Sequence, residues 1–245
     1  MKKAFFFLSI ISSVLFYSCS KDANSVSDSG TGKGGSLARF TISGNFLYVV
    51  DNENLTVFDI SDPAQPKYMN LIKVGFGIET IYPFDGKLFI GSNSAMYIYD
   101  ASDGSNPTKL GEASHLRSCD PVVANDSIAF VTVRGGSSCG GNLNALLVYD
   151  IRNLMSPYEI ARVDLSAPMG LALKDSMLYI CDGNVGIRTY NVLNPSAPKS
   201  VQVTPGEFAM DLITLDQTML AMLKDGMAYY DISNPANIKK ITVIK

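Results

Sequence analysis

The stretch Leu47-Tyr48-Val49-Val50-Asp51, followed by Phe58-Asp59 and then by Ser61-Asp62-Pro63, contains the pattern that decides the fold of this chain. A short β-rich run leads to an aromatic-Asp pair, and a turn that contains a proline follows the pair. The same order of features recurs along the chain up to its last residues. The chain is therefore predicted to be built from copies of one repeated unit.

The aromatic-Asp pair, or a close variant of it, marks the register of five units. The second residues of successive pairs are 41, 50, 41 and 40 positions apart. A period of about 41 residues, with room for four short strands, is typical of a β-propeller blade. We expect an all-β, five-bladed propeller over residues 37–245. The five pairs are Phe58-Asp59, Tyr99-Asp100, Tyr149-Asp150, Tyr190-Asn191 and Tyr230-Asp231.

The second unit shows the expected strands most clearly, near residues 77–83, 87–91, 95–100 and 108–112, with the tight-turn dipeptide Asp85-Gly86 between the first two. The second strand of several units is apolar on both faces, which favours burial between neighbouring blades. A single blade cannot cover both of its faces, whereas a closed ring of blades can. We expect the aspartates of the aromatic-Asp pairs to hold the turns that follow them.

Two segments also resemble a known family. Leu47-Tyr48-Val49-Val50-Asp51 and Leu178-Tyr179-Ile180-Cys181-Asp182, each followed by an aromatic-Asp or aromatic-Asn strand and a proline turn, resemble LVIVD repeats. The resemblance covers essentially all of residues 36–245. It implies β-propeller blades in a bacterial or archaeal cell-surface protein, and it implies no particular activity. The chain has no Trp, so its repeats do not match the WD40 pattern.

Residues 1–18 are predicted to be a lipoprotein signal peptide. Lys2 and Lys3 precede an apolar stretch at 4–17, which is shorter than the ~20 residues of a membrane-spanning helix. Leu15-Phe16-Tyr17-Ser18-Cys19 resembles a bacterial lipobox, with Phe16 where an aliphatic residue is usual. The resemblance makes Cys19 the lipid-bearing N-terminus of the mature chain. The alternative is an ordinary secretory signal with an incidental cysteine.

Residues 19–36 are predicted to be the lipidated cysteine and a flexible tether, because Ser and Gly dominate them. Ser20-Lys21-Asp22 resembles the export tag of lipoproteins on the outer leaflet of some outer membranes. We expect a lipid-anchored outer-membrane protein, at the cell surface or on the periplasmic face. The formal net charge of −3 shows no basic excess. We therefore expect the lipid to attach the protein to the membrane, and we expect no nucleic-acid partner.

The spacing of 50 marks an insertion in the third unit, at residues 134–142, between the second and third strands. Its four glycines allow unusual backbone angles or the close approach of a partner. Cys139 lies in this loop, and Cys119 lies where the first strand of the unit begins, on the same face of the blade. An oxidising location favours a Cys119–Cys139 disulfide, with Cys181 as a possible competitor. Three scattered cysteines lack the paired spacing of a metal site.

The beginnings of the innermost strands supply the candidate ligand-binding face. In a propeller these positions circle one mouth of the channel, with the glycine-rich loop beside them. Carboxylates from several blades could coordinate Ca²⁺, which takes about six to eight oxygen ligands, although no Asp-rich calcium loop is present. The alternative is a rim of solvated side chains. The candidates are Arg39, Glu79, Asp120, Arg134 and Asp211, with Gly170 at the remaining blade.

The expected function is that of a cell-envelope lipoprotein whose propeller binds a small ligand or a protein without catalysis. The alternative is a propeller hydrolase that uses two of the carboxylates at the channel mouth, with or without a cation. A third possibility is a structural component of an envelope assembly. The single histidine, His115, restricts other catalytic options, and no nucleophile elbow, P-loop or zincin motif occurs. No cofactor is expected apart from Ca²⁺.

Overall fold

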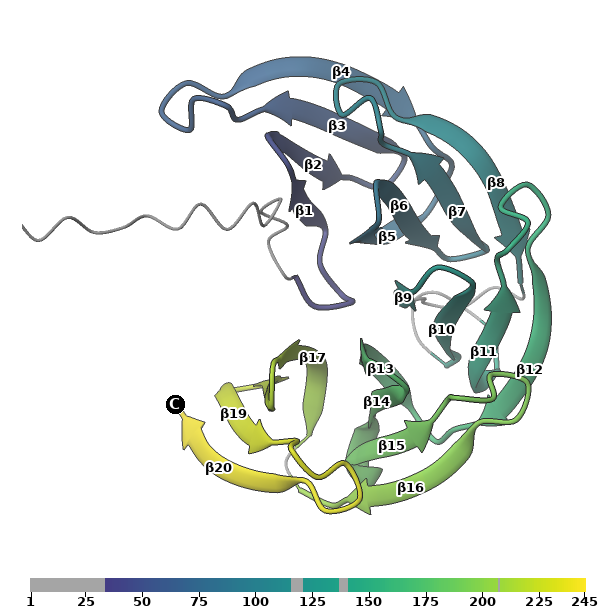
Figure 1. The fold of residues 1–245 in the computed structure, drawn as a ribbon, viewed down its shortest axis with the longest axis vertical. Coiled ribbons are helices and arrows are strands. Elements are labelled where there is room, and N and C mark those ends of the chain that lie inside the picture. The colour runs from purple at the N-terminus through teal and green to yellow at the C-terminus, as the bar shows by residue number, and fades with distance from the viewer. Residues whose placement is uncertain (1–33, 116–120, 137–140, 207) are drawn as a thin grey trace, which may run out of the picture.

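The computed structural model describes residues 34–115, 121–136, 141–206 and 208–245. Within these residues, twenty strands form five antiparallel sheets of four strands each, arranged around one axis (Figure 1). Each sheet uses four consecutive strands in chain order, with the first strand innermost and the fourth outermost. The prediction of an all-β, five-bladed propeller is confirmed.

The strands of each blade follow the repeat. Blade 1 contains β1 (Phe40–Ser43), β2 (Phe46–Val50), β3 (Asn54–Asp59) and β4 (Lys67–Lys73). Blade 2 contains β5 (Ile78–Phe84), β6 (Lys87–Ser92), β7 (Ala95–Asp100) and β8 (Thr108–Ser114). Blade 3 contains β9 (Val122–Ala124), β10 (Ile128–Arg134), β11 (Asn144–Asp150) and β12 (Tyr158–Asp164). Blade 4 contains β13 (Pro168–Lys174), β14 (Met177–Asp182), β15 (Ile187–Asn191) and β16 (Lys199–Thr204), with a short 3₁₀ turn, η1 (Gly183–Val185), between β14 and β15. Blade 5 contains β17 (Ala209–Leu215), β18 (Thr218–Leu223), β19 (Gly226–Asp231) and β20 (Lys239–Ile244).

Local hydrogen bonds explain why the repeat is visible in the sequence. In every blade, the side-chain oxygen of the anchor Asp or Asn accepts a hydrogen bond from the backbone N–H two residues later, at 2.8–3.0 Å. This bond fixes the turn that leads to the outermost strand, as predicted. The five acceptors are Asp59, Asp100, Asp150, Asn191 and Asp231. The insertion of the third unit lies between β10 and β11, also as predicted.

The hydrophobic core consists of four clusters, each between two consecutive blades. In the second strand of a blade, side chains alternate between the two neighbours. Tyr48 and Val50 of β2 therefore pack on blade 2, where Leu88 and Ile90 of β6 meet them. Among the described residues, no fifth cluster joins blade 5 to blade 1.

Within the described residues, the ring is consequently open between blades 5 and 1. Six consecutive residues of β10 are buried, whereas burial alternates along β2 and β18. Figure 1 shows the same difference as a sector without a sheet between β17–β20 and β1–β4. The expectation of blades covered on both faces is confirmed for blades 2 to 4. For blades 1 and 5, the described residues supply a neighbouring blade on one side.

The predicted signal peptide, Cys19 and most of the predicted tether lie outside the described residues. Within the part that the structure describes, no helix has the length and apolar character needed to cross a membrane.

Candidate functional site: the N-terminal strap and the channel pocket

Residues 34–38, here called the N-terminal strap, run along the inner strands before the chain enters blade 1. The Asp211 carboxylate of β17 accepts hydrogen bonds from the backbone N–H groups of Ser36 and Leu37, at 3.1 and 3.0 Å. The Ser36 hydroxyl donates to the same carboxylate at 2.9 Å and accepts from the Leu171 N–H of β13 at 2.8 Å. The strap thus ties the start of blade 1 to blades 4 and 5.

The contact between strap and β17 is buried and close. Ser36 is 1% exposed and Asp211 is 7% exposed. A Cβ atom on Gly35 would lie 2.0 Å from the Asp211 carboxylate, and one on Gly170 would lie 2.2 Å from it. Both positions therefore require glycine. Burial raises the pKa of Asp211 above its ordinary value, and the hydrogen bonds from Leu37 and Ser36 oppose this rise.

The candidate residues at the channel mouth have different surroundings. Asp211 and Gly170 are brought together, with the strap between Asp211 and the solvent. Arg39 is exposed, and its guanidinium donates to the Ile78 carbonyl at 3.2 Å. Glu79 and Arg134 are half-buried, and Arg134 is the last residue of β10.

Three other candidates, Asp120, Cys119 and Cys139, lie outside the described residues, so the disulfide between the two cysteines stays a prediction. Cys181 is buried and free, and burial raises the pKa of its thiol. In the described segments, no group of three or more His, Cys, Asp or Glu side chains is placed to hold a metal ion.

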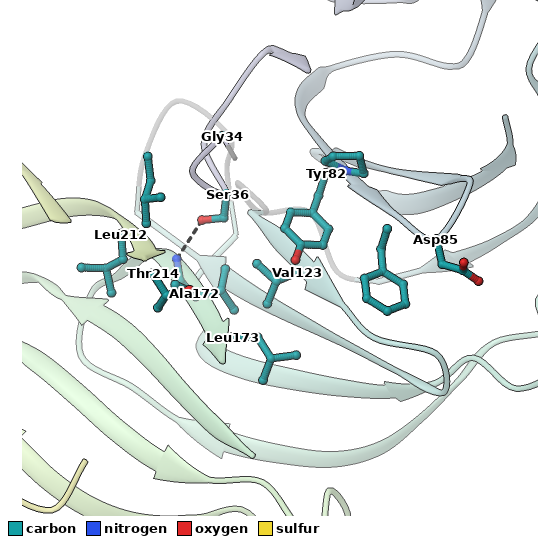
Figure 2. Close-up of a pocket in the computed structure, with 13 residues that line it drawn as sticks. Gly34, Ser36, Tyr82, Asp85, Val123, Ala172, Leu173, Leu212 and Thr214 are labelled. Carbon is teal, nitrogen blue, oxygen red and sulfur yellow. Dashed lines mark hydrogen bonds between the residues drawn. The ribbon is translucent and has the colours of Figure 1, made fainter. Parts of the chain in front are cut away.

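A pocket of about 250 Å³ lies beside the strap, between the innermost strands of blades 2 to 5 (Figure 2). Its walls mix apolar and polar surface, with the apolar part somewhat larger. Figure 2 shows the Tyr82 ring extending among the lining side chains, with Ser36 on one side and Val123 next to its hydroxyl. The apolar lining includes Val123, Leu171, Ala172, Leu173, Leu212 and Ile213.

Tyr82 provides the distinctive polar group of this pocket. Its hydroxyl makes no hydrogen bond within the described residues, and burial raises its pKa, so the hydroxyl keeps its proton and can donate. Asp85, in the β5–β6 turn, also lines the pocket and is exposed, so the pocket reaches solvent on that side.

The sequence contained a signal for Tyr82 that the repeat pattern did not use. In each blade, one residue of the first strand pairs with the residue of the second strand that aligns with Tyr48 of blade 1. Four of these five residues line the pocket, and Tyr82 is the aromatic one. Aligning the innermost strands at this register would have singled it out. The five residues are Thr41, Tyr82, Val123, Ala172 and Ile213.

Comparison with protein families matches the LVIVD repeat at residues 34–72, a segment that begins with the strap and ends inside β4. The protein is thus a five-bladed propeller whose first blade matches the LVIVD repeat. No curated protein matches the chain.

Solved structures share the fold of this LVIVD-repeat propeller at low sequence identity. A protein from Lactobacillus plantarum has 13% identity and a TM-score of 0.66, with 81% of this chain and 67% of that chain covered. The periplasmic gluconolactonase PpgL of Pseudomonas aeruginosa has 10% identity and a TM-score of 0.64, with 82% and 67% covered. BamB from Moraxella catarrhalis has 10% identity and a TM-score of 0.57, with 77% and 54% covered. The propeller thus spans between 54% and 67% of the length of these three structures.

Proposed function

We propose that this LVIVD-repeat propeller is a cell-envelope lipoprotein that binds a small, mostly apolar ligand in its channel pocket, without catalysis. One observation carries the proposal: apolar side chains from four blades line a pocket that Tyr82 also lines, and the Tyr82 hydroxyl has no partner in the described residues. Apolar walls with a few directed polar groups are typical of ligand sites. The shared fold with a gluconolactonase, at 10% identity, transfers no substrate to this chain.

The volume and the charges of the pocket narrow the class of ligand. A cavity of roughly 150 Å³ is enough for benzene, so about 250 Å³ suits a single substituted ring or a short branched chain. The Asp85 carboxylate at the solvent side is paired with the Lys87 ammonium at 3.2 Å, so the lining residues offer no uncompensated charge to a charged ligand. We therefore expect an uncharged molecule with one hydrogen-bonding group, placed to meet the Tyr82 hydroxyl.

The pocket is tested with two probes of nearly the same shape, p-cresol and toluene, followed by ligand-observed NMR and calorimetry. We expect p-cresol to bind roughly 2- to 10-fold more tightly than toluene, because one neutral hydrogen bond contributes about 0.5–1.5 kcal/mol. Tyr82→Phe should remove this difference. Ala172→Phe should fill the pocket and abolish binding of both probes, whereas Ala236→Phe, in the exposed turn of blade 5, should not.

Two results would contradict the ligand-binding proposal. One is the absence of binding of either probe to the wild-type protein. The other is unchanged binding to Ala172→Phe, which would place the probes outside the channel.

The lipoprotein part of the proposal rests on the N-terminal sequence. A chain without a basic excess is suited to an anchor made of acyl chains. Cys19→Ala should move the protein from the membrane fraction to the soluble fraction, and it should prevent labelling by radioactive palmitate. A variant that stays with the membrane would contradict lipid attachment at Cys19.

The proposed Cys119–Cys139 disulfide is suited to the oxidising envelope. Titration of free thiols in the denatured mature protein should detect one thiol, from Cys181. Three thiols would contradict the disulfide.

A further inference from the structure

Blade 3 departs from the repeat at two positions beside its anchor turn. In blades 1, 2 and 5 the backbone N–H that the anchor accepts belongs to a serine, Ser61, Ser102 or Ser233. In blade 3 it belongs to Arg152. The residue of the fourth strand that pairs with the anchor is Tyr158 in blade 3, whereas it is a lysine in blades 1, 4 and 5 and a threonine in blade 2. Departures from a regular pattern are expected at functional sites.

The two departing residues close over the anchor carboxylate of Asp150. The Arg152 Nε donates to both oxygens of this carboxylate, at 3.0 and 2.9 Å, and Nη2 donates to Oδ2. The Tyr158 hydroxyl also donates to Oδ2, at 3.3 Å. The Asp150 side chain is 5% exposed, whereas the Arg152 side chain is 72% exposed. The carboxylate therefore lies behind the guanidinium, holds its plane, and leaves its outer edge to the solvent.

A pocket of about 270 Å³ lies against this group, between blades 3 and 4. Ser127 lines it from the β9–β10 turn, and Ser196 lines it from the β15–β16 turn. This pocket shares no lining residue with the channel pocket. The departures from the repeat thus meet at a separate hollow, whose apolar lining consists of Ile128, Ile160 and Pro195.

The polar groups that this pocket offers to a ligand are hydrogen-bond donors. The Arg152 Nη1 has no partner in the described residues, so Nη1 and Nη2 present the outer N–H bonds of the guanidinium side by side. This arrangement matches two oxygens of one carboxylate or phosphate group. The hydroxyls of Ser127 and Ser196 are likewise unbonded within the described residues and can donate. Besides Asp150, no acidic side chain is among the described residues that line the pocket.

The size of the pocket defines the rest of the ligand. A cavity of roughly 150 Å³ is enough for benzene, so about 270 Å³ holds one ring together with a charged group. We infer that the pocket between blades 3 and 4 binds an oxyanion, a carboxylate or a phosphate, that is attached to a small apolar body. Arg152 is the main contact of the oxyanion, and the apolar body packs on the isoleucines, the proline and the Tyr158 ring.

The site is tested with the detergent-solubilised full chain and three probes that share one ring: benzoate, phenyl phosphate and the neutral benzyl alcohol. Ligand-observed NMR and calorimetry measure the affinities. We expect at least one of the two anions to bind roughly 10-fold more tightly than benzyl alcohol, because hydrogen bonds to charged groups are stronger than neutral ones. The anion that binds more tightly identifies the carboxylate or the phosphate as the group recognised. Acetate and inorganic phosphate, which lack the ring, should bind more weakly than the corresponding probe.

Arg152→Ser is the variant that isolates the guanidinium. It gives blade 3 the residue that blades 1, 2 and 5 already have at this position, so the turn should keep its fold. The affinity for the preferred anion should fall roughly 10-fold, to that of benzyl alcohol. Arg162→Ser is the matched control and should bind as the wild type does. Arg162 lies in β12 and forms a similar two-bonded pair with Glu159, but it does not line the pocket.

Four results would overturn the oxyanion site. Benzyl alcohol that binds as tightly as both anions would show that charge is not recognised. Anion binding that Arg152→Ser leaves unchanged would place the probes elsewhere. An equal loss in Arg152→Ser and Arg162→Ser would show a general effect of surface charge. Acetate or inorganic phosphate that binds as tightly as its ring-bearing counterpart would contradict the apolar body.

Discussion

Blades 2 to 4 and blades 1 and 5 are built from the same repeat but differ in what covers them. Leu88 of blade 2 and Leu47 of blade 1 occupy the same place in the second strand, yet Leu88 is fully buried and Leu47 is half-buried. The anchor turns are alike in all five blades. The repeat therefore determines the local structure of a blade, and the position of the blade in the ring determines how much hydrophobic stabilisation it obtains.

The largest expected effect is the difference between these two leucines. Leu88→Ala should lower the free energy of unfolding by about 2–5 kcal/mol, because it opens a cavity between two blades. Leu47→Ala should lower it by only ~1 kcal/mol, because less buried area is lost. Urea denaturation measures both. Equal costs at low protein concentration would show that Leu47 is covered within one chain.

The second largest effect concerns the N-terminal strap. Asp211→Ala leaves the buried N–H groups of Ser36 and Leu37 without their acceptor and should cost roughly 2–3 kcal/mol in urea denaturation. Asp225→Ala, at an exposed turn position of blade 5, is the matched control and should have little effect. If Asp211→Ala is as stable as the control, the strap does not hold blades 4 and 5 to blade 1. Ser36→Ala combined with Asp211→Ala should show a non-additive cost, because the two residues act together.

These two comparisons show which features could be predicted from the sequence. The anchor turns were predictable because each Asp accepts a hydrogen bond from a backbone N–H only two residues later. The open sector was not, because Leu47 and Leu88 are the same residue in the same motif and differ only in their distant neighbours. Likewise, composition placed Ser36 at the end of the tether, while its partner Asp211 lies 175 residues away. Contacts of this kind leave no local pattern.

A smaller effect is the pH dependence of the strap. Because burial raises the pKa of Asp211, the folded protein holds this proton at a higher pH than the unfolded chain does. The stability from this group is fully present below the pKa of the unfolded chain, and it is lost as pH rises through the folded pKa. Asp211→Asn does not titrate, so the advantage of the wild-type protein over it should be larger at pH 3 than at pH 7. An advantage that grows with pH would contradict the raised pKa.

The smallest expected effect compares two anchors of the repeat, Asp150 and Asp100. Hydrogen bonds from the Arg152 side chain and backbone lower the pKa of Asp150 to about 2. At Asp100 the backbone N–H of Ser102 is the main cause of a lowered pKa, and no arginine contributes. The stability from a lowered carboxyl pKa is present above the pKa of the unfolded chain and is lost as pH falls through the folded pKa. NMR titration of the side-chain carbons should therefore find Asp150 ionised at a pH where Asp100 is already partly protonated. Arg152→Ala should bring the Asp150 midpoint up toward that of Asp100 and leave Asp100 unchanged. If the Asp150 midpoint does not move, the ordinary turn of the repeat lowers its pKa without the arginine, and the two anchors are equivalent.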